Sequence, residues 1–298
     1  MSKFHIPVMT EEVLNYLNLA PGKIIVDATM GTAGHSRLIL ERILPGGRLI
    51  GIDRDKQSLE SARQRLSDFS GSCDFVHGNF MNIDTILKSL DVKKIDGVLF
   101  DLGISSFQLE DPQRGFSFQN EGPLDMRLDT ESYISAYDLV NNLTEEEISN
   151  LLWSFGQERW HNRIAHLLVE ERKRSPISTT SQLADIVTRS IPARYRYRYH
   201  RIHPATRTFQ AVRIAVNREL ESLEEAINKA FTVLEKGGRI CVISFHSLED
   251  RIVKFAFRHA AGEQLLNIIT PKPLVPRFQE VESNPSSRSS KLRVGEKI

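Results

Sequence analysis

The 298-residue sequence predicts an α/β protein whose mainly parallel, Rossmann-like sheet is interrupted by an inserted helical region. Short apolar runs alternate with amphipathic, helix-like segments from Lys23 to Phe100, which is the pattern of βαβ units. The alternation stops after Gly103 and resumes at Arg239. The sequence between these points contains turns and helix-like pieces but no convincing strand.

The first half of the chain predicts strands and helices in regular order. Short apolar runs predict strands at 24–27, 48–53, 73–76 and 95–100, and the near-continuous apolar character of the last suits burial on both faces. Amphipathic segments predict helices at 35–43, 55–66 and 83–90. Asp55 is expected to cap the second of these helices, because its carboxylate can accept amide hydrogen bonds at the helix start.

The second half begins with helices and then returns to the α/β pattern. Thr144 and Glu147 form the pattern of a capping box. Hydrophobic residues from Phe209 to Phe231 recur at spacings that predict one long helix, ended by the KGG sequence at 236–238. The α/β pattern then resumes with a strand at 239–245 and a helix at 247–259.

Composition is that of an ordinary globular protein and excludes several classes. Hydrophobic residues make up 40% of the chain and charged residues 26%, which excludes a disordered or fibrous protein. No run approaches the ~18 consecutive apolar residues of a membrane span, and residues 1–5 lack a signal-peptide core, so we expect a cytoplasmic protein with no membrane partner. Cys73 and Cys241 lie in apolar runs without metal-ligand spacing, which indicates buried thiols and no metal site.

A glycine-bearing loop follows the first predicted strand, at 27–35 (DATMGTAGH). Gly31 and Gly34 would let backbone amides approach a ligand closely. About twenty residues later the second strand ends in Asp53, whose carboxylate can accept hydrogen bonds from both hydroxyls of a ribose. The alternative is that the glycines form a tight turn and Asp53 caps the next helix. The loop and the acidic strand end together favour an adenosine-type cofactor.

The same loop separates two candidate cofactors, NAD and S-adenosylmethionine. A dinucleotide needs a G-x-G-x-x-G turn for its pyrophosphate, and the sequence at 31–34 (GTAG) departs from that pattern. S-adenosylmethionine has no phosphate, and Asp27 is placed to meet its cationic amino group. Asp101 adds a carboxylate at the end of the fourth strand, where ligands of open α/β sheets bind. Methyl transfer is therefore favoured over hydride transfer.

Six further segments have specific sequences: 5–9 (HIPVM), 101–108 (DLGISSFQ), 114–118 (RGFSF), 122–127 (GPLDMR), 203–211 (HPATRTFQA) and 244–251 (SFHSLEDR). These segments resemble the motifs of one family, the S-adenosylmethionine-dependent 16S ribosomal RNA cytosine-N4 methyltransferases called RsmH or MraW. The resemblance covers nearly the whole chain. It implies N4-methylation of a cytidine in the decoding region of 16S ribosomal RNA, within the small ribosomal subunit.

The resemblance also implies a domain plan and a set of cofactor contacts. It implies a class I methyltransferase domain at 1–107 and 205–298 and an inserted helical domain for RNA recognition at 108–204. The implied cofactor contacts are Ala33, Gly34, His35, Asp53, Phe80, Asp101 and Gln108. Ala33 stands where the family has glycine, and an alanine suits this place if its φ is negative.

Candidates for contacts with the reacting amine lie at the ends of the fourth and fifth predicted strands. They are Asp101, Ser105, Ser106 and His246. A polar acceptor beside the amine would concentrate its lone pair for attack on the methyl group. His246 has an alternative role as a helix-start or core histidine.

Basic residues are concentrated in one segment, although the net charge is only +1. Between Ile186 and Arg218 there is no Asp or Glu. The residues that we expect to contact RNA are Arg194, Arg196, Arg198, Arg201 and Arg207. Tyrosines interleave with these arginines and offer rings for base stacking. The alternative is a solvated basic face with inward tyrosines, and the tail residues Arg288, Lys291 and Arg293 are a weaker candidate for RNA contact.

Several alternatives remain open on the sequence. An NAD-dependent oxidoreductase would share the early sheet, and a non-catalytic RNA-binding module would explain the arginines but not the acidic strand ends. Another RNA or a non-RNA acceptor would also fit the fold, because fold does not determine function. A homodimer is neither indicated nor excluded.

Overall fold

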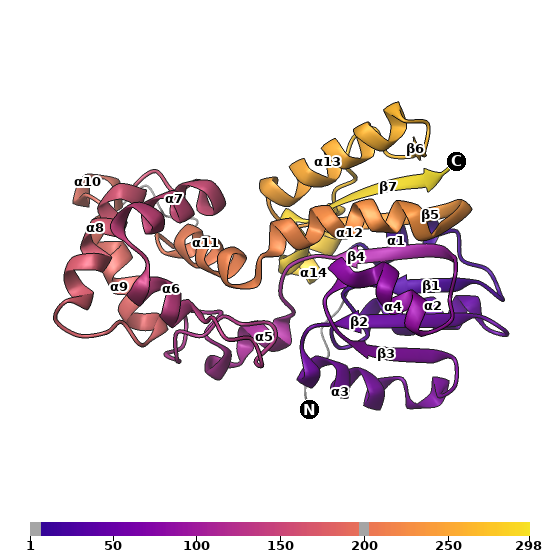
Figure 1. Ribbon diagram of the computed structural model, residues 1–298, viewed down its shortest axis with the longest axis horizontal. Helices are drawn as coiled ribbons and strands as arrows, with labels where there is room; N and C mark the ends of the chain where they lie inside the picture. Colours follow the sequence, from indigo (N-terminus) through magenta and orange to yellow (C-terminus); the bar gives the residue numbers. More distant parts are fainter. Residues whose placement is uncertain (1–6, 197–202) are drawn as a thin grey trace. The chain divides into compact units, whose positions relative to one another are not determined.

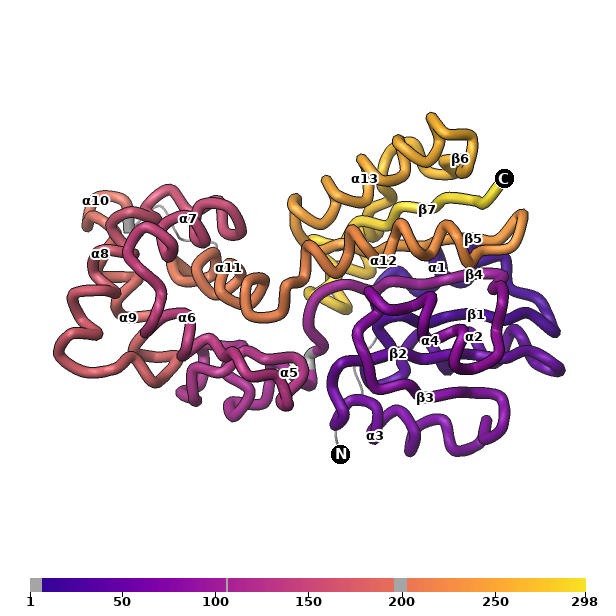
Figure 2. The backbone as a smooth tube through the Cα atoms, viewed as in Figure 1, coloured from indigo at the N-terminus to yellow at the C-terminus, as the bar shows by residue number. Residues whose placement is uncertain are grey.

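The protein is described from a computed structural model, which places residues 7–196 and 203–298. The chain divides into two compact units, Met1–Ser105 with Leu220–Ile298, and Ser106–Glu219 (Figure 1). Figure 2 lets the reader follow the chain out of the first unit after β4 and back into it along α12. Helix α11 (Thr206–Asn217) packs on α7 in the second unit, so that unit extends beyond the expected insert of 108–204.

The first unit is built on a seven-stranded sheet. Its strands are β1 (Ile24–Asp27), β2 (Arg48–Asp53), β3 (Cys73–His77), β4 (Ile95–Asp101), β5 (Leu234–Ser244), β6 (Leu266–Ile268) and β7 (Lys291–Lys297). Their order across the sheet is β3-β2-β1-β4-β5-β7-β6. Neighbours from β3 to β5 run parallel, whereas β7 is antiparallel to β5 and β6. The predicted α/β class with a Rossmann-like sheet is confirmed.

Helices cover both faces of this sheet. One face carries α1 (Thr10–Tyr16), α2 (Gly34–Ile43) and α3 (Lys56–Arg65), and the other carries α4 (Ile83–Ser89), α12 (Glu219–Val233) and α13 (Ser247–Gly262). Successive residues of β1 serve opposite cores, because Ile25 packs on the first face and Val26 on the second. Burial on both faces explains why the strands read as continuous apolar runs, and each fully buried Val or Ile contributes about 1.5–3 kcal/mol.

The strand order creates a switch point between β1 and β4. From β1 the chain proceeds outward through β2 to β3, and it then returns to place β4 on the other side of β1. The crossovers at a switch point leave a crevice outside the carboxyl ends of the strands, and open α/β sheets bind ligands there. Asp27 ends β1 and Asp101 ends β4, so both carboxylates lie at this edge.

The last part of the tail belongs to the sheet of the first unit. It forms the strand β7, which closes the sheet against β5. Arg293 is only 7% exposed and donates from Nε to Asp250 Oδ1 at 2.7 Å. Lys291 lies 3.7 Å from the same carboxylate group. The suggested RNA contact was therefore wrong for Arg293. Its guanidinium is buried, and it is paired with the carboxylate of Asp250, the kind of partner that a buried charge needs.

The long helix predicted from Phe209 to Phe231 was also wrong, because it is two helices. Arg218 separates α11 from α12 with φ 49 and ψ 43, a left-handed conformation that interrupts a right-handed helix. The hydrophobic spacing continues through the break, which is why the sequence concealed it. Helix α12 ends at Val233, and the KGG sequence that was expected to end it lies within β5.

The second unit is helical in its described part. Its helices are α5 (Ser106–Glu110), α6 (Ala136–Asn142), α7 (Glu145–Gly156), α8 (His161–Arg172), α9 (Thr180–Ser190), α10 (Ala193–Arg196) and α11. Capping boxes start α6, α7 and α9, and the one predicted at Thr144 and Glu147 is confirmed. Each such cap contributes about 1 kcal/mol by satisfying otherwise unpaired amides.

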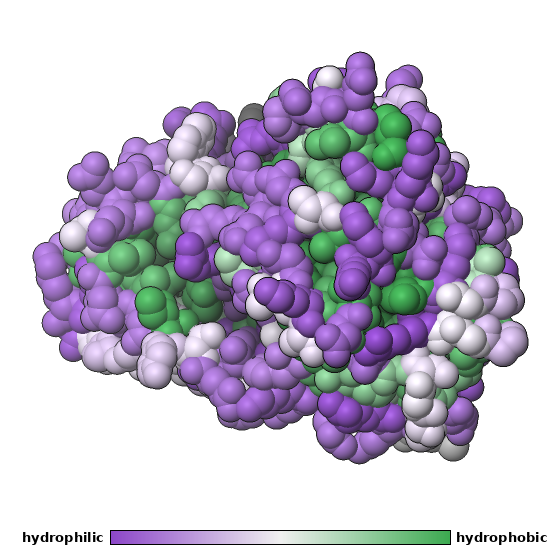
Figure 3. Space-filling view, turned by 45° about the vertical axis from the view of Figure 1, so that its right-hand side comes forward, coloured by the Kyte–Doolittle hydropathy of each residue, from purple (hydrophilic) through white to green (hydrophobic). Residues whose placement is uncertain are grey.

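The surface and the helices bear on membrane contact. Among the residues that the structure describes, no helix combines the length and the apolar character needed to cross a bilayer. In the space-filling view, hydrophilic side chains border the hydrophobic patches of each unit on the face drawn (Figure 3).

The two cysteines lie in the first unit. Cys241 is buried in the core, and Cys73 is half-buried with its thiol pKa raised by burial to about 12.

Candidate functional site

The loop between β1 and α2 is held in place by its neighbours in the sheet. The Met30 N–H donates to the carbonyl of Ile52 at 2.9 Å, and the Gly31 N–H donates to Asp53 Oδ2 at 2.7 Å. On the other side, the Asp101 N–H donates to Thr29 Oγ1 at 2.7 Å. The loop thus bridges the ends of β2 and β4, and the three predicted strand-end carboxylates converge on it.

Asp27 is the most deeply placed of these carboxylates. It is 2% exposed, and it accepts a hydrogen bond from Ser36 Oγ at 2.6 Å and another from the Thr29 N–H at 3.3 Å. Burial raises the pKa of Asp27 above its ordinary value, although the hydrogen bond from Ser36 opposes this. A cation that reached this carboxylate would favour its charged form. Ser36 and Thr29 were missed in the sequence, and only the contact itself reveals their role.

Asp53 both orders the backbone and remains able to bind a ligand. Its Oδ2 accepts from Gly31, and its Oδ1 accepts from the Asp55 N–H at 2.9 Å. Burial raises the pKa of Asp53 to about 6, and these two hydrogen bonds oppose that rise. Asp55 itself caps α3 by accepting from the Gln57 N–H, as predicted. The capping role considered for Asp53 therefore belongs to Asp55, and each Asp53 oxygen retains a lone pair for a ribose hydroxyl.

Ala33 contradicts the condition set for it in the sequence. It has φ 63 and ψ 36, in the left-handed region, rather than a negative φ. An alanine there costs about 1–2 kcal/mol relative to a right-handed conformation. Ala33 is fully buried among core side chains, so its methyl group recovers about 0.8 kcal/mol of that cost. The chain therefore tolerates alanine at a position where glycine would be unstrained.

Substitutions at Ala33 test this balance. We expect Ala33→Gly to change the free energy of unfolding by less than about 1 kcal/mol, because relief of strain offsets the lost methyl and the added chain entropy. We expect Ala33→Val to destabilise the protein by at least about 2 kcal/mol, since a β-branched side chain is poorly accommodated at positive φ in a packed core. Urea denaturation measures both. A valine variant as stable as the wild type would contradict a left-handed conformation at residue 33.

The buried His35 and the half-buried Asp101 form a pair with unused hydrogen-bonding capacity. His35 is 5% exposed, and its Nε2 lies 3.4 Å from Asp101 Oδ2. Within the described chain, neither ring nitrogen of His35 nor Asp101 Oδ1 has a hydrogen-bond partner, although all three atoms are buried. An unsatisfied buried polar atom costs about 1–3 kcal/mol. Three such atoms together at the switch point indicate a place where a ligand completes the hydrogen bonds.

Two further predicted cofactor contacts lie on the same unit. Gly34 begins α2, and a Cβ there would lie 3.3 Å from the Cβ of Pro7. Phe80 follows β3 and packs edge-on against Phe100, with ring centroids 5.7 Å apart. The guanidinium of Arg54 lies 5.9 Å from the Phe80 ring centroid. Phe80 therefore presents a half-buried aromatic surface beside the end of the sheet.

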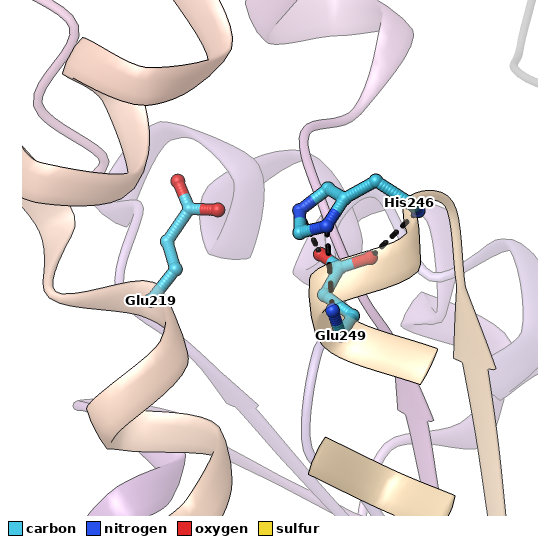
Figure 4. Close-up of side chains that lie close together, drawn as sticks. All are labelled: Glu219, His246 and Glu249. Carbon is cyan, nitrogen blue, oxygen red and sulfur yellow. Dashed lines mark hydrogen bonds and ion pairs between the residues drawn. The ribbon is translucent and has the colours of Figure 1, made fainter. Parts of the chain in front are cut away.

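His246 caps the helix that follows β5. Its Nδ1 accepts from the Glu249 N–H at 3.3 Å, and Glu249 Oε2 accepts from the His246 N–H at 3.2 Å (Figure 4). His246 Nε2 lies 3.1 Å from Glu249 Oε1, so the buried glutamate engages both the ring and the backbone. The helix-start role considered for His246 is thus present in the structure. An Nδ1 that accepts a hydrogen bond carries no proton, so the ring proton lies on Nε2.

The remaining predicted residues of this group lie close to the unit boundary. Ser105 is the last residue of the first unit and is half-buried. Ser106 begins α5, and its side chain lies outside the described part. Gln108 is 4% exposed and belongs to the second unit. The first unit alone therefore brings together Asp27, the 33–35 segment, Asp53 and Asp101.

The predicted RNA-binding arginines belong to the second unit. Arg194 is exposed in α10, and Arg207 is exposed and donates to the carbonyl of Gln157 at 3.3 Å. Arg196 ends α10 but its side chain is not described, and Arg198 and Arg201 lie outside the described residues. The structure therefore describes the side chains of two of the five predicted arginines, Arg194 and Arg207.

Carboxylates from other segments neutralise part of the basic run. Arg189 pairs with Glu171 of α8 at 3.1 Å. Arg213 pairs with Glu219, also drawn in Figure 4, at 2.9 Å. The sequence from Ile186 to Arg218 contains no Asp or Glu, so these two arginines obtain their carboxylate partners from other segments through folding.

The fold and the convergent carboxylates define a class of protein. The sheet, with its switch point between β1 and β4 and its antiparallel β7, is a Rossmann-like class I methyltransferase sheet, as predicted. The chain belongs to the MraW methylase family, whose pattern matches residues 2–298.

Relatives support this membership over the full length. A protein of Clostridioides difficile (strain 630) is 46% identical, with 100% of both chains covered, and one of Persephonella marina is 50% identical, with 99% of both covered. Both are called ribosomal RNA small subunit methyltransferase H. Among solved structures, an rRNA methylase of Streptococcus thermophilus is similar with a TM-score of 0.46 and 13% identity, covering 99% of both chains.

Proposed function

We propose that this protein transfers a methyl group from S-adenosylmethionine to N4 of a cytidine in the decoding region of 16S ribosomal RNA. The observation that carries this proposal is the convergence of Asp27, Asp53 and Asp101 on one loop at the switch point of the sheet. Family membership and the names of the relatives support methylation of small-subunit ribosomal RNA. The finer choice of cytosine N4 rests on the motifs shared with the cytosine-N4 methyltransferases.

The residues at the switch point fit the donor. S-adenosylmethionine carries a ribose with two hydroxyls, an ammonium, a carboxylate and a sulfonium whose methyl group is activated for transfer. Asp53 offers two acceptor oxygens for the hydroxyls, and Asp27 offers negative charge for the ammonium. The ring nitrogens of His35 and Oδ1 of Asp101, which have no hydrogen-bond partner among the residues that the structure describes, add polar atoms that a ligand would satisfy. The remaining proposed contacts are Ala33, Gly34, Phe80 and Gln108.

Asp101 is the best placed acceptor for the amine of the base. Its backbone is held by Thr29, its Oδ2 faces His35, and its Oδ1 has no hydrogen-bond partner within the described chain. An exocyclic amine that donated to Oδ1 would have its lone pair less delocalised into the ring and would be held in line with the methyl group. Such alignment can supply several kcal/mol, up to about 7–11 in ideal cases. Ser105, Ser106 and His246 are proposed as further walls of this pocket.

The helical unit is proposed to recognise the RNA. A base must leave its stack to reach the half-buried carboxylate of Asp101, and this costs least in a loop or single strand. Arg194, Arg196, Arg198, Arg201 and Arg207 are proposed to hold the backbone of such a strand. The substrate is proposed to be 16S ribosomal RNA within the small ribosomal subunit, which would place the reaction in the cytoplasm. Another RNA acceptor is the second candidate.

The raised pKa of Asp53 predicts a pH dependence of donor binding. Only the ionised carboxylate accepts from both hydroxyls, so we expect the dissociation constant of S-adenosylhomocysteine to be nearly constant above pH 7 and to rise up to tenfold per unit below about 6. The folding stability of the free protein depends on pH in the opposite direction. A carboxyl raised from 3.8 to about 6 contributes stability that is present below pH 3.8 and is lost as the pH rises through about 6.

Isothermal titration between pH 5 and pH 7 measures this dependence. The control is Asp53→Asn, which should bind weakly and lose the Asp53 component while any contribution from Asp27 remains. An identical pH profile in the wild type and in Asp53→Asn would exclude Asp53 as the titrating group.

The experiment that tests the function is direct. Small ribosomal subunits from a strain lacking the enzyme are incubated with the purified protein and donor carrying a radiolabelled methyl group, and the modified nucleoside is mapped. We expect label in N4-methylcytidine in 16S ribosomal RNA. Label in another nucleoside would reject the N4 assignment, and label only in protein would reject RNA as the acceptor.

A further inference from the structure

A cluster of arginines and aromatic rings lies on the helical unit, and only part of it was visible in the sequence. Trp160 directly precedes α8 and Tyr195 lies in α10, with ring centroids 5.2 Å apart. The guanidinium carbon of Arg159 is 5.3 Å from the centroid of the Trp160 ring and 5.6 Å from that of Tyr195. The guanidinium carbon of Arg194 is 4.8 Å from the Tyr195 centroid. We call these four side chains the Arg–aromatic cluster.

The two guanidinium groups of this cluster are not neutralised. Both Arg159 and Arg194 are exposed, and within the described ranges 7–196 and 203–298 neither has a carboxylate at ion-pair distance. The carboxylate next in sequence, Glu158, is fully buried, and its Oε1 accepts the Trp160 N–H at 2.9 Å. This glutamate therefore organises the start of α8 and does not pair with its neighbour Arg159.

The rings position these guanidinium groups without using their hydrogen-bonding capacity. A cation that stacks on an aromatic face engages the π system, so the N–H donors at its edge stay available. Holding the side chain in one place also reduces the entropy lost when a ligand binds. A planar guanidinium with free donors matches the oxygens of a phosphate, which can accept two parallel hydrogen bonds. The cluster thus has the chemistry of a preorganised phosphate site.

The surrounding sequence favours a polyanion over a single small anion. Arg194 begins the basic run that continues to Arg201, and there is no Asp or Glu from Ile186 to Arg218. Two phosphates along one strand would meet two guanidinium groups, of which Arg159 lies against both rings and Arg194 lies against Tyr195. Trp160 and Tyr195 are half-buried, so their main part here is to hold the arginines.

We propose that the Arg–aromatic cluster grips backbone phosphates of the RNA substrate, with Arg159 and Arg194 each meeting one phosphate. This inference rests on the proposed function, because it takes the substrate to be RNA. It adds Arg159 and Trp160, at the junction of α7 and α8, to a basic surface that the sequence placed only at 194–207.

The test measures binding against salt concentration for protein-free 16S ribosomal RNA and for small subunits in parallel. Loss of one phosphate contact lowers the slope of log K against log salt by about 0.7 for a single strand or about 0.9 for a duplex. We expect Arg159→Gln and Arg194→Gln each to show this change, with affinity at low salt about three- to tenfold weaker. Trp160→Leu keeps both charges, so it should weaken binding about two- to fivefold and leave the slope near that of the wild type.

Arg174→Gln is the matched control. Arg174 is 82% exposed beyond the other end of α8, and Glu171 lies 3.8 Å from it, so its removal should not change the slope. Binding of S-adenosylhomocysteine and the thermal melting curve should be unchanged in all four variants, which separates a local effect from misfolding.

Each other result has a definite meaning. Wild-type slopes in both Arg159→Gln and Arg194→Gln would overturn the phosphate assignment. Weaker binding to subunits with unchanged binding to protein-free RNA would also overturn it, in favour of a ribosomal protein as the partner. If the wild type methylates small-subunit RNA while these variants bind normally, only the inference about the cluster fails. If the wild type methylates no RNA, the proposed function fails as well.

Discussion

Replacement of Asp101 by alanine is expected to lower kcat/KM for methyl transfer by about 10²- to 10³-fold, the scale seen when one preorganised polar contact to a transition state is removed. No neighbouring side chain could take over the role of the Asp101 carboxylate. Its Oδ1 has no hydrogen-bond partner within the described residues, and its Oδ2 faces His35. The backbone of Asp101 is held separately through Thr29, so the loop should keep its position. Transfer of a radiolabelled methyl group to small subunits measures the loss.

Two comparisons make this prediction specific. Removing a half-buried carboxylate whose Oδ1 has no partner within the described residues should not destabilise the fold, so the melting temperature of Asp101→Ala should equal or exceed that of the wild type. Asp68→Ala deletes the same group at a position that is 75% exposed, and its activity should be normal. Undiminished methylation by Asp101→Ala would remove this residue from the chemistry.

Replacement of Asp53 by alanine is expected to weaken donor binding by about 100-fold or more. Two hydrogen bonds to a charged acceptor contribute about 1.5–3 kcal/mol each. The Gly31 and Asp55 amides would also lose their acceptor, which would loosen the loop that the donor must meet. Titration with S-adenosylhomocysteine measures the effect, and RNA affinity supplies the internal control because the proposed RNA contacts lie in the other unit.

The RNA affinity of Asp53→Ala decides how its loss of donor affinity is interpreted. Weak donor binding with normal RNA binding would assign Asp53 to the donor. A parallel loss of both would indicate general unfolding. Donor binding within about threefold of the wild type, a difference under 1 kcal/mol, would contradict the ribose role.

The sheet was predictable from the sequence because burial on both faces leaves a direct record. Each parallel strand reads as an apolar run, and the acidic residues Asp27, Asp53 and Asp101 mark where three of those runs end. Parallel strands end at one edge, so the convergence of these carboxylates followed from their positions. The strand β7 left no such record, because Arg293 and Gly295 interrupt its apolar residues and long-range pairing with β5 determines its structure.

The rest of the site depends on contacts that local sequence does not encode. The left-handed conformation of Ala33 is imposed by the hydrogen bonds of the loop, and a sequence cannot show a φ angle. The sequence around His246 would look the same whether this histidine caps a helix or acts in catalysis. Arg159 and Trp160 meet the basic run only because α8 and α10 come together in the helical unit.

The most direct measurement is a crystal structure of the protein with S-adenosylhomocysteine. We expect its ribose hydroxyls on the carboxylate of Asp53 and its amino-acid end beside Asp27, His35 and Asp101, at the carboxyl ends of β1 and β4. A structure in which the ligand occupies another part of the protein and leaves these side chains without contact to it would contradict the proposed site.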